Sequence, residues 1–301
     1  DPRQTYFWIC CLCINQHRVR EARARGDTIP FKEFQEKFGQ TVRGIRHIVA
    51  LMAPWTDPLY IRRVWCNFEM FTAIKLGEER CKVSVTMPPR EAEDMRRVLL
   101  KQGNIDKLWQ VMTNIDIESS EASVMEDKQN ILTLIEQDYG FPDLNEAVAN
   151  CLKMWVLACC EWFLEREFEK SDCSDKDLVK ACISVGKLLR SVGCGERAIQ
   201  VLHQGRFVCE RADILMTLDG AKLVREIGVA YYVAGKPDKE LQAYEEAKRI
   251  RKYVGVLDTP DGAKLLTNIG EARRKGADLA GAQEAYAAAR QIRELTNTLE
   301  T

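Results

Sequence analysis

The stretch Thr217–Leu223 reads TLDGAKL, and Thr259–Leu265, which lies 42 residues further along the chain, reads TPDGAKL. The same offset relates further pairs of residues: Gly228 and Gly270, Tyr244 and Tyr286, Ala247 and Ala289, Ile250 and Ile292. A fainter copy lies another 42 residues upstream, at Asp177, Lys180, Gly186 and Leu202. Self-similarity at a fixed period predicts that one supersecondary unit is stacked several times.

Each repeating unit is predicted to be a pair of helices. In the middle unit, apolar residues recur at helical spacing between Ala221 and Ala234, and again between Asp238 and Val254. The segment 235–238, Gly-Lys-Pro-Asp, separates the two, because Gly ends a helix well and Pro suits the start of the next.

Small residues recur at fixed positions of the predicted pairs. They are Gly186, Gly228 and Gly270 on the first helices, and Gly205, Ala247 and Ala289 on the second. A Gly inside a helix costs about 1 kcal/mol relative to Ala. Its repetition therefore predicts that the two helices of a pair approach closely at these points.

Residues 175–301 resemble the tetratricopeptide repeat, in the long-unit form of kinesin light chains. The motif positions are matched by Gly228, Tyr231, Tyr244 and Ala247, and in the next unit by Gly270, Ala282, Tyr286 and Ala289. Glu240 and Arg273 depart from the pattern, which favours Ala and an aromatic residue there. The resemblance implies an all-α solenoid.

In that family the first helices line a groove that holds a protein or peptide partner. By the resemblance, this groove presents Lys222, Arg225, Tyr232, Lys264, Asn268 and Arg274. The alternative is that the six residues form an ordinary solvated helix face.

The N-terminal part is predicted to be an α/β domain with a parallel sheet. Residues 6–14 are a continuous apolar run, typical of a strand buried on both faces, and 47–53 and 81–87 are two further predicted strands. Between them, apolar residues at helical spacing predict helices over 31–45 and 64–76. Alternation of strands and helices indicates βαβ units.

Motifs in this part resemble two related families. Residues 8–16 and 62–65 are similar to motifs of fungal heterokaryon-incompatibility domains, although Cys10 replaces a common acidic residue. Residues 48–69, ending in Trp65-Cys66-Asn67-Phe68-Glu69, are similar to Toll/interleukin-1 receptor (TIR) domains, whose first strand and loop have no counterpart here. The fold class expected is therefore an incomplete TIR-like domain followed by a tetratricopeptide solenoid.

In enzymatic TIR domains the matching glutamate supports cleavage of NAD at the nicotinamide–ribose bond. The resemblance implies that Glu69 is the catalytic residue, with Trp65, Asn15 and Gln16 as substrate contacts. A carboxylate is suited to stabilise the oxocarbenium-like sugar that forms when nicotinamide leaves. The alternative is that Glu69 is a surface carboxylate and Trp65 a core residue.

Composition excludes several classes of protein. The net charge of −1 gives no general field for nucleic acid or an anionic membrane, and an uninterrupted apolar run long enough to span a bilayer is missing from the sequence. The 3 histidines are scattered, so no metal site is expected, and neither a G-x-x-x-x-G-K-[ST] nor a G-x-G-x-x-G motif occurs. The 12 cysteines, without a signal-peptide pattern, favour a reduced, cytoplasmic protein.

These observations predict an α/β domain over 1–90, a helical connector over 91–172 and three helix pairs over 173–301. The function expected is that of a scaffold or signalling adaptor without a cofactor, which holds a protein partner and whose N-terminal domain self-associates. The alternatives are an NAD-cleaving hydrolase that uses Glu69, with NAD as its substrate, and a cargo adaptor of the kinesin-light-chain type.

Overall fold

The computed structural model describes residues 25–26, 31–102, 115–170 and 174–296, and 75% of the chain is helical. The chain divides into two compact units that interleave along the sequence. Unit 1 takes the described residues of 1–50, 60–84 and 116–145, and unit 2 takes those of 51–59, 85–115 and 146–301.

Unit 1 is built around Phe68, which is 2% exposed. Its ring lies 5.1 Å from that of Phe38 and 6.0 Å from that of Phe71, measured between ring centroids. Two helices supply these rings, α3 (Phe31–Ile45) and α5 (Val64–Leu76), and both have the bounds that the apolar spacing predicts. The short helix α4 (Leu59–Arg62) precedes α5, and α8 (Met125–Asp138) packs against α5.

The described residues contain one sheet, in which β1 (His47–Leu51) pairs in parallel with β2 (Lys82–Thr86). Both strands fall inside the predicted ranges. The expectation that 47–53 is a buried strand holds for Ala50, which is 0% exposed, but not for its neighbours. Val49 and Leu51 are each 50% exposed. The predicted strand over 6–14 lies outside the described residues.

Unit 2 contains a long helix, α9 (Phe141–Lys170), whose first residues belong to unit 1. Within unit 2, Glu167 of α9 is 4% exposed and lies 2.5 Å from Nη1 of Arg96 on α6 (Pro89–Gln102). By length and composition α9 is apolar enough to cross a membrane, contrary to the expectation from sequence. This is weak evidence for a span, since buried helices of ordinary domains pass the same test, and 44% of its most apolar window is buried.

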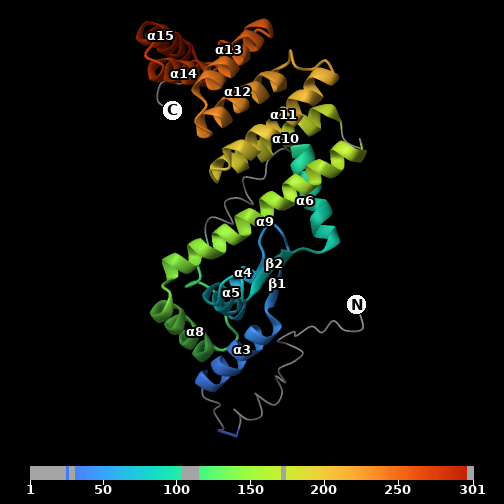
Figure 1. Cartoon of the computed structure of the whole chain (residues 1–301), viewed down its shortest axis with the longest axis vertical. Coiled ribbons are helices and arrows are strands. Elements are labelled where there is room, and N and C mark those ends of the chain that lie inside the picture. The colour runs from blue at the N-terminus through green and yellow to red at the C-terminus, as the bar shows by residue number, and fades with distance from the viewer. Residues whose placement is uncertain (1–24, 27–30, 103–114, 171–173, 297–301) are drawn as a thin grey trace. The chain divides into compact units, whose positions relative to one another are not determined.

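The rest of unit 2 is a series of helix pairs, which Figure 1 shows following one another from α10 to α15. Their bounds are α10 (Asp175–Ser191), α11 (Gly195–Arg211), α12 (Leu218–Val233), α13 (Pro237–Tyr253), α14 (Pro260–Lys275) and α15 (Leu279–Leu295). Each first helix begins at a hydroxyl cap. Thr217 accepts a hydrogen bond from the Gly220 backbone at 3.3 Å, and Thr259 accepts one from Gly262 at 3.2 Å.

The repeated glycines lie where the helices of a pair touch, as the sequence predicts. A Cβ atom built on Gly228 would lie 2.5 Å from Cδ1 of Tyr244, and one on Gly270 would lie 2.6 Å from Cε1 of Tyr286. In the first pair Gly186 faces Leu202 in the same manner. The same contact between the two helices of a pair therefore recurs every 42 residues.

Candidate functional site

The first helices of the three pairs carry the same charged pair near their N-termini. An aspartate carboxylate lies one turn from a lysine ammonium: Asp177 to Lys180 at 3.5 Å, Asp219 to Lys222 at 3.8 Å, and Asp261 to Lys264 at 3.7 Å. Aspartate suits the positive end of the helix dipole, which explains its place in the first turn. The lysine side chains are 42%, 41% and 66% exposed, so their charges remain available to a partner.

Two arginines bind one buried carboxylate between α10 and α12. Glu226 is 2% exposed, and its Oε2 lies 3.2 Å from Nη1 of Arg190, while Oε1 pairs with Arg225. Arg225, which the sequence predicts to face a partner, is therefore also a structural residue. Two guanidinium groups on a single carboxylate leave one positive charge uncompensated within this cluster.

An aromatic residue and a lysine meet at the far end of α12 and α14. Tyr232 is 51% exposed, and Nζ of Lys275 lies 3.7 Å from the centre of its ring. This is a cation–π contact at short range. Arg274, next in the chain, is exposed and lies 2.8 Å from Glu271, which also accepts a hydrogen bond from Tyr286 at 2.6 Å.

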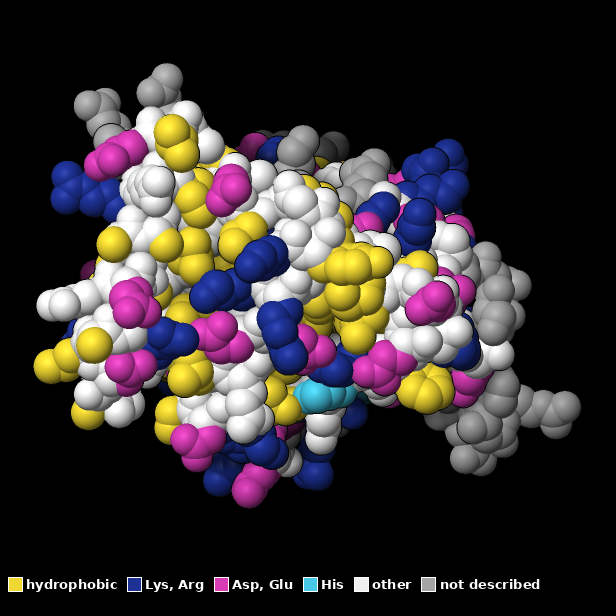
Figure 2. Space-filling view, turned by 90° about the horizontal axis from the view of Figure 1, so that it is seen from above, with side chains coloured by type: hydrophobic (Ala, Val, Ile, Leu, Met, Phe, Trp, Pro, Cys, Tyr) yellow, Lys and Arg dark blue, Asp and Glu magenta, His cyan; other side chains and the backbone are white. Residues whose placement is uncertain are grey.

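The six predicted groove residues are thus distributed over two helices. Lys222, Arg225 and Tyr232 belong to α12, while Lys264, Asn268 and Arg274 belong to α14. Asn268 is half-buried and the three residues Tyr232, Lys264 and Arg274 are exposed. On the face that Figure 2 presents, cationic and acidic side chains are interleaved, with hydrophobic side chains exposed between them.

The sequence did not indicate Glu226, Arg190 or Lys275 as members of this surface. Ser184 and Asn268 occupy the positions equivalent to Glu226, so the repeat gives no sign of a buried acid there. The repeat could have indicated Arg190, because it occupies the position equivalent to the predicted groove residues Tyr232 and Arg274, 42 and 84 residues before them.

Glu69 lies on α5 in unit 1 and is half-buried. Burial raises the pKa of its carboxyl, while the hydroxyl of Tyr60, which donates to Oε2 at 2.9 Å, and the charge of Arg63 act in the opposite direction. Trp65 lies one turn earlier, with its ring edge-on to Phe68 at 6.0 Å. Asn15 and Gln16 lie outside the described residues, so the structure places only Trp65 and Glu69 of the predicted NAD site.

The part of the chain that the structure describes contains no group of three or more His, Cys, Asp and Glu side chains arranged to hold a metal ion. Burial raises the pKa of the Cys159 thiol to about 11, which keeps it protonated and unreactive near neutral pH. Cys160, its neighbour on α9, is fully buried, and its pKa is also raised, mainly by burial.

Comparison with known proteins assigns no family. No protein-family model matches the chain, and no curated protein matches it either. Among solved structures, the chain is similar to the crystal structure of BtubC (BKLC) from P. vanneervenii. The two are 18% identical, with a TM-score of 0.43, over 70% of this chain and 90% of that chain. A TM-score this low supports no statement about function.

Proposed function

We propose that this protein is an interaction scaffold, and that α10 to α15 form a tetratricopeptide-type solenoid whose first helices bind a peptide or protein partner. The observation that carries the proposal is the same exposed Asp–Lys pair on three successive first helices. Stability does not require such repetition, because an exposed ion pair contributes only about 0 to 1 kcal/mol.

The partner that fits this surface carries carboxylates. A carboxylate of the partner can replace the aspartate as the ion-pair partner of the lysine at little cost, since the intrahelical ion pair is weak. The other end of the same helices carries Arg274, which is 54% exposed, and Tyr232, whose aromatic ring offers apolar contact area. Aromatic and arginine side chains are the residues that most often dominate the energy of protein interfaces.

Selection of peptides from a displayed library against the full chain tests this proposal. We expect the selected peptides to be acidic and to lose most of their affinity for a Lys222→Glu/Lys264→Glu variant. The matched control is Arg249→Glu/Lys252→Glu, which reverses two exposed charges on α13, a second helix. If both double variants bound the peptides alike, the first helices would not be the binding face.

The second part of the proposal is that the N-terminal domain, residues 1–90, signals by self-association. Light scattering of the purified full chain tests this. If the domain self-associates, the measured mass should rise with protein concentration. A mass that stays constant from micromolar to high micromolar concentration would contradict it.

A second candidate function is NAD cleavage, which rests on the resemblance of residues 48–69 to TIR domains and on the placement of Trp65 and Glu69 one turn apart on α5. In this proposal Glu69 stabilises the positive sugar that remains when nicotinamide leaves. Nicotinamide release from NAD by the full chain is the measurement. We expect Glu69→Gln to abolish the release, and a variant with full activity would refute the role of Glu69.

A further inference from the structure

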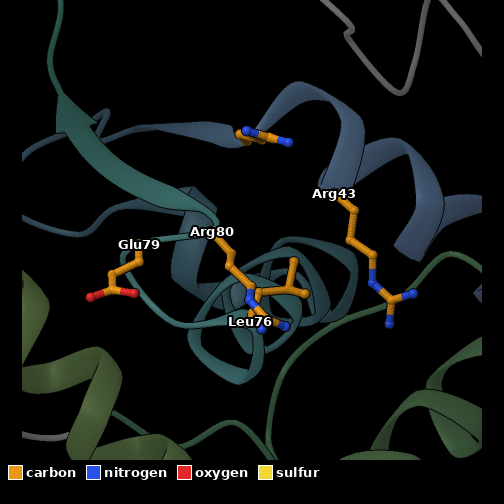
Figure 3. A pocket seen from close by; sticks show the side chains of 5 residues that line it. Arg43, Leu76, Glu79 and Arg80 are labelled. Atoms are coloured by element: carbon orange, nitrogen blue, oxygen red, sulfur yellow. The ribbon is translucent and has the colours of Figure 1, made fainter.

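Unit 1 contains a cavity of about 580 Å³ whose lining is dominated by arginines: Arg43, Arg46, Leu76, Glu79 and Arg80. Figure 3 shows Arg80 extending alongside Leu76 and Arg43 extending from its helix in roughly the same direction, while the carboxylate of Glu79 points away from both. The cavity therefore has cationic walls and one aliphatic wall.

The backbone holds these arginines in place at the meeting point of three segments. Arg43 lies in the last turn of α3, and Arg46 follows that helix in the left-handed conformation, at φ 59°. The carbonyl of Arg46 accepts a hydrogen bond at 3.0 Å from the backbone of Lys82, at the start of β2. Arg80 belongs to the tight turn just before it, where its N–H donates to the Gly77 carbonyl at 3.0 Å.

The charges of these arginines are not neutralised by the residues that the structure describes. Arg43, Arg46 and Arg80 are all exposed, and within the described ranges none of the three has an ion pair or a side-chain hydrogen bond. Like charges that line one cavity repel one another. A bound anion would offset this repulsion.

A second cavity, of about 430 Å³, adjoins the first and shares Arg43, Leu76 and Arg80 with it. Its lining is mixed. Polar groups come from the amides of Gln35 and Gln40 and from the hydroxyl of Thr72, which donates to the Phe68 carbonyl at 2.7 Å, and apolar atoms come from residues such as Phe71 and Leu134. Two carboxylates also line it: Glu36, and Asp138, which is paired with Lys75 at 2.5 Å. Cavities that take small organic ligands have volumes of about 300 to 1,000 Å³. The space exceeds what a bare inorganic ion requires and suits a molecule with hydrogen-bonding groups.

We propose that these adjoining cavities bind a small organic phosphate of about nucleotide size, with its phosphate on Arg43, Arg46 and Arg80 and its organic part beside Gln35, Gln40 and Thr72. A phosphomonoester carries about −1.5 to −2 charges at pH 7, which matches several guanidinium groups better than a single carboxylate does. The planar guanidinium also binds phosphate oxygens through two hydrogen bonds at once.

Calorimetric titration of the full chain tests this site with three probes: adenosine monophosphate, adenosine and inorganic phosphate. We expect the monophosphate to bind most tightly, adenosine not to bind, and inorganic phosphate to bind at least 10-fold more weakly than the monophosphate. Arg80→Gln and Arg43→Gln should each weaken binding of the monophosphate by about 10-fold or more, since a charge-assisted hydrogen bond contributes about 1.5 to 3 kcal/mol.

Arg249→Gln is the matched control, because Arg249 is an exposed arginine on α13, outside unit 1. It should leave the affinity unchanged. Circular dichroism of each variant shows whether it is folded, and Arg43→Lys, which keeps the charge but not the planar fork, should have an intermediate affinity. The proposal is overturned if the monophosphate does not bind, or if it binds the arginine variants and the control alike. Equal affinities for the monophosphate and inorganic phosphate would overturn the role of the second cavity.

Discussion

The ring of Tyr244 on α13 lies against the backbone of α12 at Gly228, with only 2.5 Å between its Cδ1 atom and the place where a Cβ of residue 228 would be. Tyr244 is 2% exposed, so the ring is enclosed and has no room to retreat. The same relationship joins Tyr286 to Gly270 one repeat later. A missing side chain on one helix thus makes the space for an aromatic ring on the next.

Substitution of Gly228 by Ala should destabilise the repeats. The added methyl group forces Tyr244 or the helix axis to shift, and overpacking of this kind costs about 1 to 3 kcal/mol. Chemical denaturation followed by circular dichroism measures the change. Gly276→Ala is the control, because Gly276 has a negative φ and a Cβ there would make only ordinary contacts, at 3.5 Å and beyond. If the two substitutions lowered the free energy of unfolding equally, the loss of Gly itself would be the cause, and not the clash of the new methyl group with the Tyr244 ring.

Ala277→Gly should stabilise the last helix pair. The turns within the three pairs place Gly193, Gly235 and Ala277 at equivalent positions, with φ of 77°, 68° and 62°. Glycine adopts this left-handed conformation without steric cost, whereas alanine loses about 1 kcal/mol. We expect a gain of roughly 0.5 to 1 kcal/mol in the free energy of unfolding. Ala287→Gly, at an exposed position within α15, should instead lower stability by about 1 kcal/mol.

Removal of the Glu226 carboxylate should be costly because it leaves two arginines without their partner. Glu226→Ala is expected to lower the free energy of unfolding by about 3 to 5 kcal/mol, as is typical when one member of a buried ion pair is removed. Asp219→Ala breaks the ion pair between Asp219 and Lys222 on the same helix, whose side chains are 30% and 41% exposed. Because this pair is partly exposed to solvent, its loss should lower the free energy of unfolding by about 1 kcal/mol or less. Similar losses in both variants, measured by denaturant melts, would contradict the structural role of Glu226.

Glu69 should make the stability of unit 1 depend on pH. Its pKa is raised in the folded state above the ordinary value of 4.5, so folding favours the protonated carboxyl. The penalty for burying the charge is fully present above the folded pKa and disappears as the pH falls below 4.5. Glu69→Gln removes this charge and still accepts the hydrogen bond from Tyr60, so it should stabilise the fold at pH 7 more than at pH 4. Thermal melts of the two proteins check this prediction. If the stability difference between Glu69→Gln and the unaltered protein were the same at pH 7 and pH 4, the raised pKa would be refuted.

The sequence by itself determined the local elements and the repeat. Helices α3 and α5 have the predicted bounds because apolar residues at helical spacing report directly which face is buried. The glycines at 42-residue intervals predicted close helix contacts, since each repeat must present the same small residue at the same contact. The ranges 1–90, 91–172 and 173–301, and the groove on the first helices, stay predictions.

Only the tertiary structure decided how charged residues from distant segments are grouped. Arg43, Arg46 and Arg80 line one cavity because the end of α3 and the turn before β2 are joined by the hydrogen bond between Lys82 and Arg46. Arg190 reaches Glu226 because α10 packs on α12, and this contact depends on the path of the chain between them. Packing also leaves Val49 and Leu51 of β1 each 50% exposed, although the apolar composition of that segment predicts burial. Spacing along the chain records neighbours on one helix or strand, whereas such groupings arise from packing between elements far apart in sequence.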